Sequence, residues 1–343
     1  MTTLSRRLGW TLVALSLLIH VVTVYAYSRQ PDQLAAFTVM PIWLWGGIGL
    51  FLSVVAFYFL RASLSLILTG VWAVTLLVGA DEARVLAHFG KEPPLPGPAE
   101  FFKNQRVIRV LTLNCATFSY GNPAPDIAAW QPDIVLLQDA FPHQVRQVAD
   151  ALYGGGGDYR AQMTNGIVTR WEIKEEVRPV AGRNQQVTGR NQQVTIRHPG
   201  GAEMVVVNVH LRTAATDLRL WDKSAWVAHK NNRVLRQQEL AVTLQILEDT
   251  VPFPNIPVIF GGDFNAPATD LVHRQLTPDF NDAFASAGTG WGNTYQRRFP
   301  ILRIDHLYAT RHFTPLRSRV VTTRNSDHRM VIADFLPGPS VAP

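Results

Sequence analysis

The sequence predicts an α/β domain of layered sheets with helices outside, preceded by about three transmembrane helices. Three observations support this fold class. Long apolar runs are confined to residues 9–80, a proline-rich stretch follows them, and strand-like and helix-like patterns alternate from residue 106 onward. Helices mixed with both adjacent and crossing strands favour layered sheets over a barrel or a bundle.

The N-terminal part contains three apolar runs, at about residues 10–26, 42–60 and 63–80. Each is near the ~17–25 residues that a helix needs to cross a bilayer. His20 lies within the first run, where we expect it to face a neighbouring helix. Aromatic residues gather where the first run ends and the second begins, as at a membrane interface. They are Tyr25, Tyr27, Trp43 and Trp45.

The basic residues predict the orientation of these helices. Arg6, Arg7 and Arg61 would share the cytoplasmic side, whereas Arg29 and Arg84 would lie opposite, each near acidic residues. Three crossings then place everything after residue 80 outside. Alternatively, the first run is a cleaved signal peptide, and the two remaining crossings also end outside. Both interpretations predict a multi-pass protein of the cytoplasmic (inner) membrane with an extracytoplasmic catalytic domain.

A domain boundary is expected at the proline-rich stretch FGKEPPLPGPAE, residues 89–100. Prolines at this density favour extended geometry and a semi-rigid spacer. We therefore predict a transmembrane region over residues 1–88, a linker over 89–105, a catalytic domain over 106–337 and a tail over 338–343.

The catalytic domain alternates predicted strands and helices. Period-two apolar patterns and β-rich runs predict the strands, and three-to-four spacing predicts the longest helix. The strands are expected at 107–114, 133–138, 166–169, 173–180, 257–265, 302–310 and 328–335, with a hairpin at 194–211. The helices are expected at 126–130, 142–152 and 232–249.

A perfect tandem duplication, GRNQQVTGRNQQVT, occupies residues 182–195. Each copy has seven residues, an odd number, so both copies cannot present the same face of one continuous strand. We expect the second copy to enter a strand and the first copy to form a surface loop.

Polar residues capable of chemistry stand where the apolar strands end. Each alone is an ordinary turn residue. Six such sites are harder to explain in this way, because strand ends that gather at one rim form a crevice where ligands bind. The residues are Asn114, Asp139, Asn208 and His210, Asp263 and Asn265, Asp305 and His306, and Asp327 and His328.

These residue types point to a hard metal ion and an anionic substrate. Carboxylate and amide oxygens suit Mg²⁺, with Mn²⁺ as an alternative, whereas zinc would require more His or Cys. The single cysteine, Cys115, excludes an internal disulfide and is expected to be a buried, inert thiol. The net charge of +6 suits an anionic substrate, but it does not choose between nucleic acid, phospholipid and sugar phosphate.

In their order along the chain, the motifs resemble those of the endonuclease/exonuclease/phosphatase (DNase I-like) superfamily. The resemblance spans about residues 106–336 and implies a four-layer α/β/β/α sandwich with metal and phosphate at one edge. The motifs are Asn114, Gln138-Asp139, Asn208-Val209-His210, Gly262-Asp263-Phe264-Asn265, Arg303-Ile304-Asp305-His306 and Ser326-Asp327-His328.

The resemblance implies a metal site and a substrate site. Asp139 would bind Mg²⁺, although the superfamily usually has glutamate there, so this chain is one methylene shorter. Asp327 would be a second carboxylate on the metal side, and Asn114 would help to place the metal or the phosphate. Asn265 and Arg303 are further predicted contacts to the substrate.

The resemblance also implies the catalytic roles. His210 would contact phosphate and protonate the leaving oxygen. Asp263 and Asn265 would orient the attacking water and the phosphoryl oxygens. His328 would be the general base, steered by Asp305. This division of labour is chemically reasonable, because a carboxylate bonded to the base fixes its tautomer and raises its basicity.

The expected substrate is a phosphate ester or pyrophosphate, lipid-linked in view of the membrane segment. N-terminal membrane helices with an exported domain resemble the membrane-bound teicoplanin-resistance branch, which is linked to polyprenyl pyrophosphate. The stretch LRLWDKSAWVAHK, residues 218–230, could rest on lipid headgroups or pack inward as a loop. The expected partners are therefore the bilayer and a phosphate-containing substrate, with nucleic acid less favoured. The alternatives are an exported Mg²⁺-dependent nuclease and an inactive, membrane-bound binding module.

Overall fold

The computed structural model describes residues 3–86, 107–177, 190–198, 201–214 and 219–338. The chain divides into two compact units. One comprises residues 1–87 and 215–231, and the other comprises residues 88–214 and 232–343. The predicted linker, residues 89–105, lies outside the described residues.

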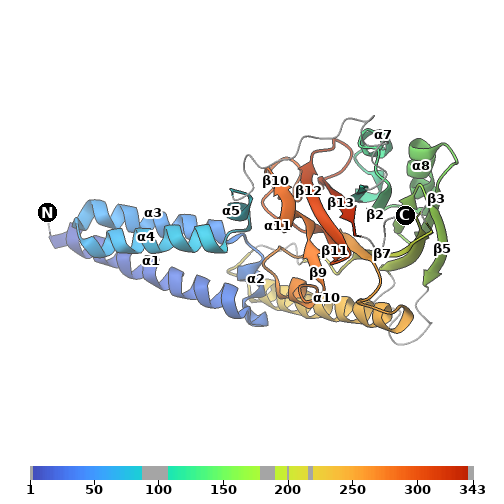
Figure 1. Cartoon of the computed structure of the whole chain (residues 1–343). Coiled ribbons are helices and arrows are strands. Elements are labelled where there is room, and N and C mark those ends of the chain that lie inside the picture. Colours follow the sequence, from blue (N-terminus) through green and yellow to red (C-terminus); the bar gives the residue numbers. More distant parts are fainter. Residues whose placement is uncertain (1–2, 87–106, 178–189, 199–200, 215–218, 339–343) are drawn as a thin grey trace. The chain divides into compact units, whose positions relative to one another are not determined.

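The first unit is built on long apolar helices (Figure 1). Helices α1 (Thr3–Arg29) and α3 (Ile42–Leu60) are long and apolar enough to cross a membrane. Helix α4 (Ser63–Gly79), with 17 residues, is apolar but shorter. Short helices complete this unit; they are η1 (Asp32–Leu34), α2 (Ala35–Thr38) and α5 (Asp81–Val85).

Small residues allow the long helices to approach closely. The Ser16 hydroxyl of α1 donates a 2.8 Å hydrogen bond to the Gly49 carbonyl of α3, and the Trp72 indole of α4 donates to the Ser16 hydroxyl at 3.0 Å. A Cβ atom at Gly49 would lie 2.1 Å from the Trp72 ring, so only glycine fits there. His20 faces α4 as expected, with a ring nitrogen 2.9 Å from the Thr75 hydroxyl.

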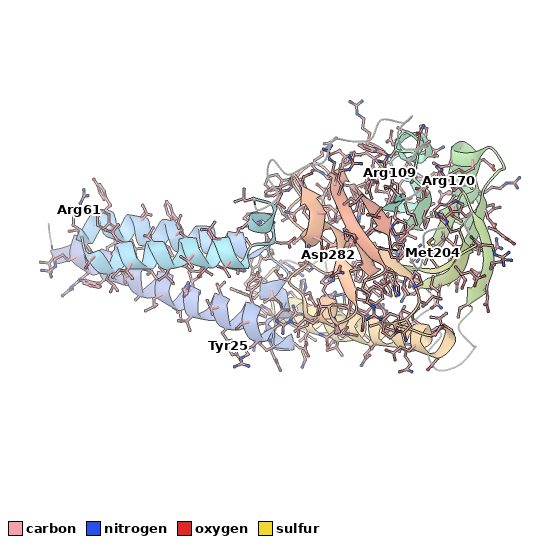
Figure 2. All side chains as sticks on the ribbon, viewed as in Figure 1. Tyr25, Arg61, Arg109, Arg170, Met204 and Asp282 are labelled. Carbon is pink, nitrogen blue, oxygen red and sulfur yellow. The ribbon has the colours of Figure 1, made fainter. Side chains whose placement is uncertain are left out.

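The two ends of this helical unit differ in composition. Arg61 lies at the end near the N-terminus, and Tyr25 lies at the opposite end of α1 (Figure 2). Near the Tyr25 end, the Phe37 and Trp45 rings stack with centroids 4.0 Å apart. Arg61 and these aromatic residues therefore lie at opposite ends of the helices.

The stretch 219–230 is mostly helical rather than a loop. Helix α10 begins at Lys223, nine residues before the predicted start, and ends at Thr250. Trp221 is 84% exposed, whereas Trp226 is half-buried and its indole donates to the Leu220 carbonyl at 2.8 Å. Of the two predicted alternatives, Trp221 fits the exposed one and Trp226 the packed one.

The second unit contains two β-sheets, which confirms the predicted α/β class (Figure 1). Sheet A has the strand order β10-β12-β13-β1-β2-β4-β3, and sheet B has the order β5-β6-β7-β8-β11-β9. The strands of sheet A are β10 (Gly288–Thr289), β12 (Phe313–Val321), β13 (Met330–Pro337), β1 (Ile108–Asn114), β2 (Ile134–Gln138), β4 (Asn165–Thr169) and β3 (Asp158–Gln162). Those of sheet B are β5 (Glu172–Val177), β6 (Gln192–Arg197), β7 (Glu203–His210), β8 (Val258–Asp263), β11 (Asp305–Thr310) and β9 (Phe280–Asp282).

Three hydrophobic layers hold the sheets and helices together. The inner faces of both sheets share one core, which includes Ile108 of β1 and Val206 of β7. The outer face of sheet A packs under helices α7 (Ala124–Ala128) and α8 (Pro142–Tyr153). The outer face of sheet B packs against Leu240 and Leu247 of α10. This α/β/β/α order agrees with the predicted sandwich.

The expected strands and helices are present, and most of their bounds shift by a few residues, whereas α10 begins nine residues early. Several elements were not predicted; they are β3, β9, β10, β12, the short helices η3 (Ala116–Phe118) and η4 (Leu271–Gln275), and helix α11 (Ala283–Ala287). The second copy of the duplication enters β6, as predicted, and the first copy, residues 182–188, lies outside the described residues.

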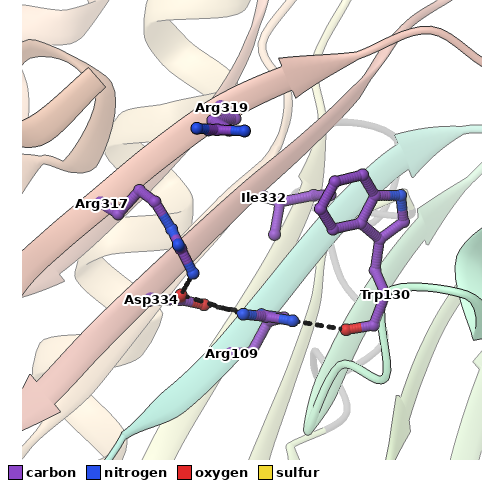
Figure 3. A pocket seen from close by; sticks show the side chains of 6 residues that line it. All are labelled: Arg109, Trp130, Arg317, Arg319, Ile332 and Asp334. Carbon is purple, nitrogen blue, oxygen red and sulfur yellow. Dashed lines mark hydrogen bonds and ion pairs between the residues drawn. The ribbon is translucent and has the colours of Figure 1, made fainter. Parts of the chain in front are cut away.

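A buried ion-pair network ties three strands of sheet A on its outer face (Figure 3). Asp334 of β13 accepts from Arg109 Nε of β1 at 2.7 Å and from Arg109 Nη2 at 3.1 Å. The same carboxylate accepts from Arg317 Nη2 of β12. Arg109 Nη1 donates to the Trp130 carbonyl at 2.8 Å. One carboxylate therefore neutralises two guanidinium groups that are almost fully buried.

Asp334→Ala is expected to lower the free energy of unfolding by about 3–5 kcal/mol, because it leaves two buried guanidinium groups without their shared carboxylate. The measurement is denaturation of the full chain in detergent. Asp150→Ala is the matched control, since its ion pair with Arg146 spans 3.7 Å and is mostly exposed. That control should change stability by less than about 1 kcal/mol. Equal losses in the two variants would contradict this assignment.

His273 of η4 is buried as a neutral imidazole on the outer face of sheet B. Its Nε2 lies 3.2 Å from the Ala266 carbonyl, and its Nδ1 lies 2.9 Å from the Tyr308 hydroxyl, so Nε2 carries the proton and Nδ1 accepts. Burial, together with the neighbouring His306, lowers the pKa of His273 from 6.5 to about 3.

Stability should therefore fall as the pH is lowered below the unfolded-state pKa of His273. The unfolded chain takes up a proton near pH 6.5, whereas the folded chain does so only near pH 3. The loss approaches about 1.4 kcal/mol per pH unit between these values and is absent above pH 6.5. Thermal denaturation between pH 7.5 and 5 should show this slope in the wild type and a flatter slope in His273→Gln. Parallel slopes would contradict the assignment.

Candidate active site

The two sheets bring the predicted catalytic residues to one shared edge. Alternate residues of a strand point to the same face. In β7, β8 and β11 the inward-facing series ends at His210, Asp263 and Asp305, and these residues are direct neighbours across the sheet. In β1 the inward-facing series ends at Asn114. The polar edge therefore lies where the inner hydrophobic core ends.

Strained backbone accompanies this edge. Asp139 has a φ of 45° and Asn265 has a φ of 51°, in the left-handed region that Asp and Asn tolerate better than most residues. Gly262 has a φ of 134°, and a Cβ atom there would lie 2.0 Å from the Val209 carbonyl oxygen. Such strain is concentrated at functional sites.

Asp263 is the centre of the hydrogen-bond network. It accepts a 3.0 Å bond from Asn114 Nδ2 and a 2.8 Å bond from the Asn265 backbone N–H. Its Oδ2 lies 3.8 Å from His210 Nε2, and His210 Nδ1 lies 3.6 Å from Asp139 Oδ1. The structure thus brings together five of the predicted residues.

His328 and Asp305, which the sequence predicts as base and steering carboxylate, are paired in the structure. His328 Nδ1 lies 2.9 Å from Asp305 Oδ2, and both side chains are buried. Burial alone would lower the pKa of His328, but the charge and hydrogen bond of Asp305, with the charges of Asp263 and Asp327, raise it to about 10. The imidazole is therefore protonated near neutral pH unless another positive charge offsets these carboxylates.

The site carries an excess of negative charge. Burial and the neighbouring Asp305 raise the pKa of Asp263, against the opposing effect of His328, His210 and the Asn114 hydrogen bond. Asp305 Oδ1 is buried and has no hydrogen-bond donor among the described residues. A cluster that is short of positive charge and of donors in this way is suited to a cation.

The donor atoms fit a divalent cation. One ligand atom from each of Asp263, Asp305 and His328 lies within 4.8 Å of the others. Asp139 also offers a carboxylate, 34% exposed, that accepts no hydrogen bond from the described residues. These hard oxygens are the donors that Mg²⁺ and Mn²⁺ prefer. Asn114 Oδ1 already accepts from the Ala116 N–H at 2.9 Å, so Asn114 positions Asp263 through Nδ2.

Two residues of the predicted motifs, Arg303 and Asn208, have structural roles instead. Arg303 is buried, and its Nη1 donates to Asp282 at 2.8 Å and lies 3.1 Å from His306 Nδ1, so the structure does not support a substrate-binding role for it. Asn208 donates to the Leu137 and Gly166 carbonyls at 2.9 and 3.0 Å, so it fastens sheet B to sheet A.

Sequence reasoning missed Tyr295 and Arg297, which border the site. The Tyr295 ring centroid lies 4.9 Å from that of His328, and the Arg297 backbone N–H donates to the Asp327 carbonyl at 2.6 Å. The only signal for them in the sequence is the basic pair Arg297-Arg298, shortly before the Arg303 motif.

The comparisons with known proteins agree with this fold. Residues 111–328 match the profile of the Endonuclease/Exonuclease/phosphatase family. Among solved structures, the chain is similar to an endonuclease/exonuclease/phosphatase from Bacteroides vulgatus, at 16% identity and a TM-score of 0.54, over 67% of this chain and 99% of that one. No curated protein matches the chain.

Two further structures carry the names of enzymes. A mannosyl-6-phosphatase from Bacteroides thetaiotaomicron is 18% identical, with a TM-score of 0.52, over 66% of this chain and 99% of that one. Humanized TDP2 of D. rerio is 16% identical, with a TM-score of 0.50, over 67% of this chain and 99% of that one. At these identities the likeness shows the fold alone, which is the DNase I-like sandwich.

Proposed function

Because the chain belongs to the endonuclease/exonuclease/phosphatase family, we propose that it is a membrane-anchored, Mg²⁺-dependent phosphohydrolase. It cleaves a phosphate ester or pyrophosphate, lipid-linked, by attack of water. Family membership supports phosphoesterase activity in general. The anchor, the lipid linkage and the metal are our inference from the helices and the site of this chain.

The observation that carries the proposal is the convergence of the polar strand ends on one edge. Asp263 is hydrogen-bonded to Asn114 and lies beside His210, and His328 is paired with Asp305. Hydrolysis of a phosphate ester requires a base that activates water and groups that hold the phosphoryl oxygens. The edge offers both kinds of group within a few ångströms.

The residues divide the work as follows. Asp305 holds His328 Nδ1, which leaves Nε2 to accept the proton of the attacking water. Asp263 and Asn265, with Asn114, orient the water and the phosphoryl oxygens, and His210 protonates the leaving oxygen. We propose that Asp139 and Asp327 would hold a divalent cation, whereas Asp305 and His328 serve as the paired base. The cation would neutralise the phosphoryl charge and offset the carboxylates that hold the pKa of His328 high.

Lipid linkage is supported by the first unit. Helices α1 and α3 are long and apolar enough to span a bilayer. Trp221 is almost fully exposed and is flanked by Arg219 and Lys223, a combination suited to the headgroup region. We propose that the protein is a multi-pass protein of the cytoplasmic membrane with its catalytic unit on the extracytoplasmic side.

One parallel assay tests the proposed function. The full chain in detergent is given a polyprenyl pyrophosphate, a phospholipid and supercoiled plasmid DNA, each with Mg²⁺ and with EDTA. We expect Mg²⁺-dependent release of phosphate or headgroup from a lipid substrate by the wild type, and none by Asp263→Ala. Plasmid nicking that disappears in Asp263→Ala, without lipid turnover, would instead identify an exported nuclease. No turnover and no binding of Mg²⁺ or Mn²⁺ would identify an inactive binding module.

A further inference from the structure

The loop of residues 291–302 is fastened to the catalytic base. Tyr295 pairs through its backbone with both Leu302 and His328, and its ring lies 4.9 Å from the His328 ring. The next turn of this loop carries Arg297, whose backbone N–H donates to the Asp327 carbonyl at 2.6 Å. The backbone of Arg297 is therefore hydrogen-bonded to Asp327, the residue directly before His328.

The side chain of Arg297 is held in place but is not neutralised. Its Nη1 donates to the Arg324 carbonyl, and its guanidinium carbon lies 5.4 Å from the centre of the Tyr120 ring. Arg329 donates to the Arg297 carbonyl at 3.0 and 3.1 Å and so fixes the backbone. Among the residues that the structure describes, no carboxylate lies within ion-pair distance of the Arg297 guanidinium.

Tyr120, the aromatic support, belongs to a second loop that is also tied to the site. This loop follows Asn114 directly and begins with left-handed residues at Ala116, Thr117 and Phe118. The Ser326 hydroxyl donates to the Asn114 carbonyl at 2.6 Å, so the loop is anchored next to Asp327 and His328. Tyr120 is 51% exposed, which leaves the Arg297–Tyr120 pair open to a ligand.

A fixed guanidinium without a carboxylate partner is suited to a phosphate. Its planar set of donors matches phosphate oxygens in pairs, and Arg297 Nε and Nη2 donate to none of the described residues. An arginine with only a structural role in its loop could lie anywhere on the surface, whereas Arg297 belongs to the loop that contacts the catalytic base. In the proposed function the centre would hold one phosphoryl group, so a guanidinium at its border would bind an adjacent one.

We propose that Arg297, supported by the Tyr120 ring, binds the second phosphoryl group of a diphosphate substrate; this rests on the proposed function. Water attacks the terminal phosphorus, and its proton goes to His328. The bridging P–O bond breaks, and the bridging oxygen leaves with the phosphoryl group held by Arg297. The products are inorganic phosphate and a monophosphate ester.

The test compares two substrates with the same apolar group, geranylgeranyl diphosphate and geranylgeranyl monophosphate. For the diphosphate, Arg297→Gln should lower kcat/KM about 10- to 100-fold, the loss expected for charge-assisted hydrogen bonds. For the monophosphate, the change should stay within about threefold. Arg297→Lys should recover part of the diphosphate activity, because it keeps the charge but loses the paired donors.

Arg298→Gln is the matched control, since it removes the same charge from the adjacent, exposed residue. It should leave the ratio of the two kcat/KM values unchanged. Equal losses on both substrates in Arg297→Gln, or an equal effect in Arg298→Gln, would overturn the subsite. A wild type that hydrolyses only the monophosphate would also overturn it while leaving the proposed function in place. A wild type that hydrolyses neither lipid would remove the proposed function itself.

Discussion

Asp263→Asn is expected to lower kcat about 10³-fold, the effect typical of a lost group in general acid–base catalysis. Asp263 accepts from Asn114 and from the Asn265 backbone and lies 3.8 Å from His210. An amide of the same shape keeps the fold but places an N–H where the structure has an acceptor. Substrate positioning and charge are then lost together.

The same substitution should also raise thermal stability in EDTA. Asp263 is buried beside Asp305, and these two effects raise the pKa of Asp263, which means that its charged form is disfavoured. Removing the charge relieves this repulsion, so the Tm in EDTA should rise by a few degrees, roughly 2–4 °C per kcal/mol. In Mg²⁺ the gain should shrink, because only the wild type gains from a cation. A lower Tm in EDTA would show that Asp263 is a structural group.

Asp139→Ala is expected to abolish metal-dependent turnover. The Asp139 carboxylate is partly exposed, and its Oδ1 lies 3.6 Å from His210 Nδ1. It is therefore available to a cation, and its loss should weaken cation binding at least about tenfold. The measurements are Mg²⁺ titration of activity and calorimetric binding of Mn²⁺.

Two further variants separate charge from backbone at this position. Asp139 has a φ of 45°, which Asn tolerates better than Ala does. Asp139→Asn keeps the backbone preference but loses the charge, so it should be as inactive as Asp139→Ala and more stable. Asp139→Glu restores the residue that is usual in the superfamily and should be tolerated or activating. If Asp139→Ala kept full activity, Asp139 would be only a turn residue.

Much of the candidate site could be predicted, because strand periodicity shows which side chains point toward the inner core. His210, Asp263 and Asp305 end strands whose alternate residues are apolar, so their inward direction follows from the core pattern. Strand periodicity does not predict which side chains are hydrogen-bonded to one another. Arg303 lies two residues before Asp305 along the chain, but its side chain is hydrogen-bonded to Asp282. Asp282 is close to Arg303 only in the folded structure, so the local sequence does not predict this contact.

Strand β12 shows why part of the fold was missed. Its sequence FTPLRSRVV contains a proline and two arginines, and its pairing with β13 shifts between Pro315 and Arg317. Proline and a bulge are tolerated in a sheet but hide the period of two. Arg317 is buried only because Asp334 lies on the neighbouring strand. Its role depends on strand pairing, which the local sequence does not contain.

The duplicated segment has a consequence for how the gene can change. Residues 185–188 and 192–195 are identical, but only the second copy continues into Ile196, which is fully buried in the inner core. Asn191 of that copy also accepts a 3.1 Å bond from the His210 backbone N–H. Loss of either copy encodes the same shortened protein and leaves both features in place. The duplication is thus genetically reversible. With one copy or two, burial of Ile196 in the inner core would keep the register of β6.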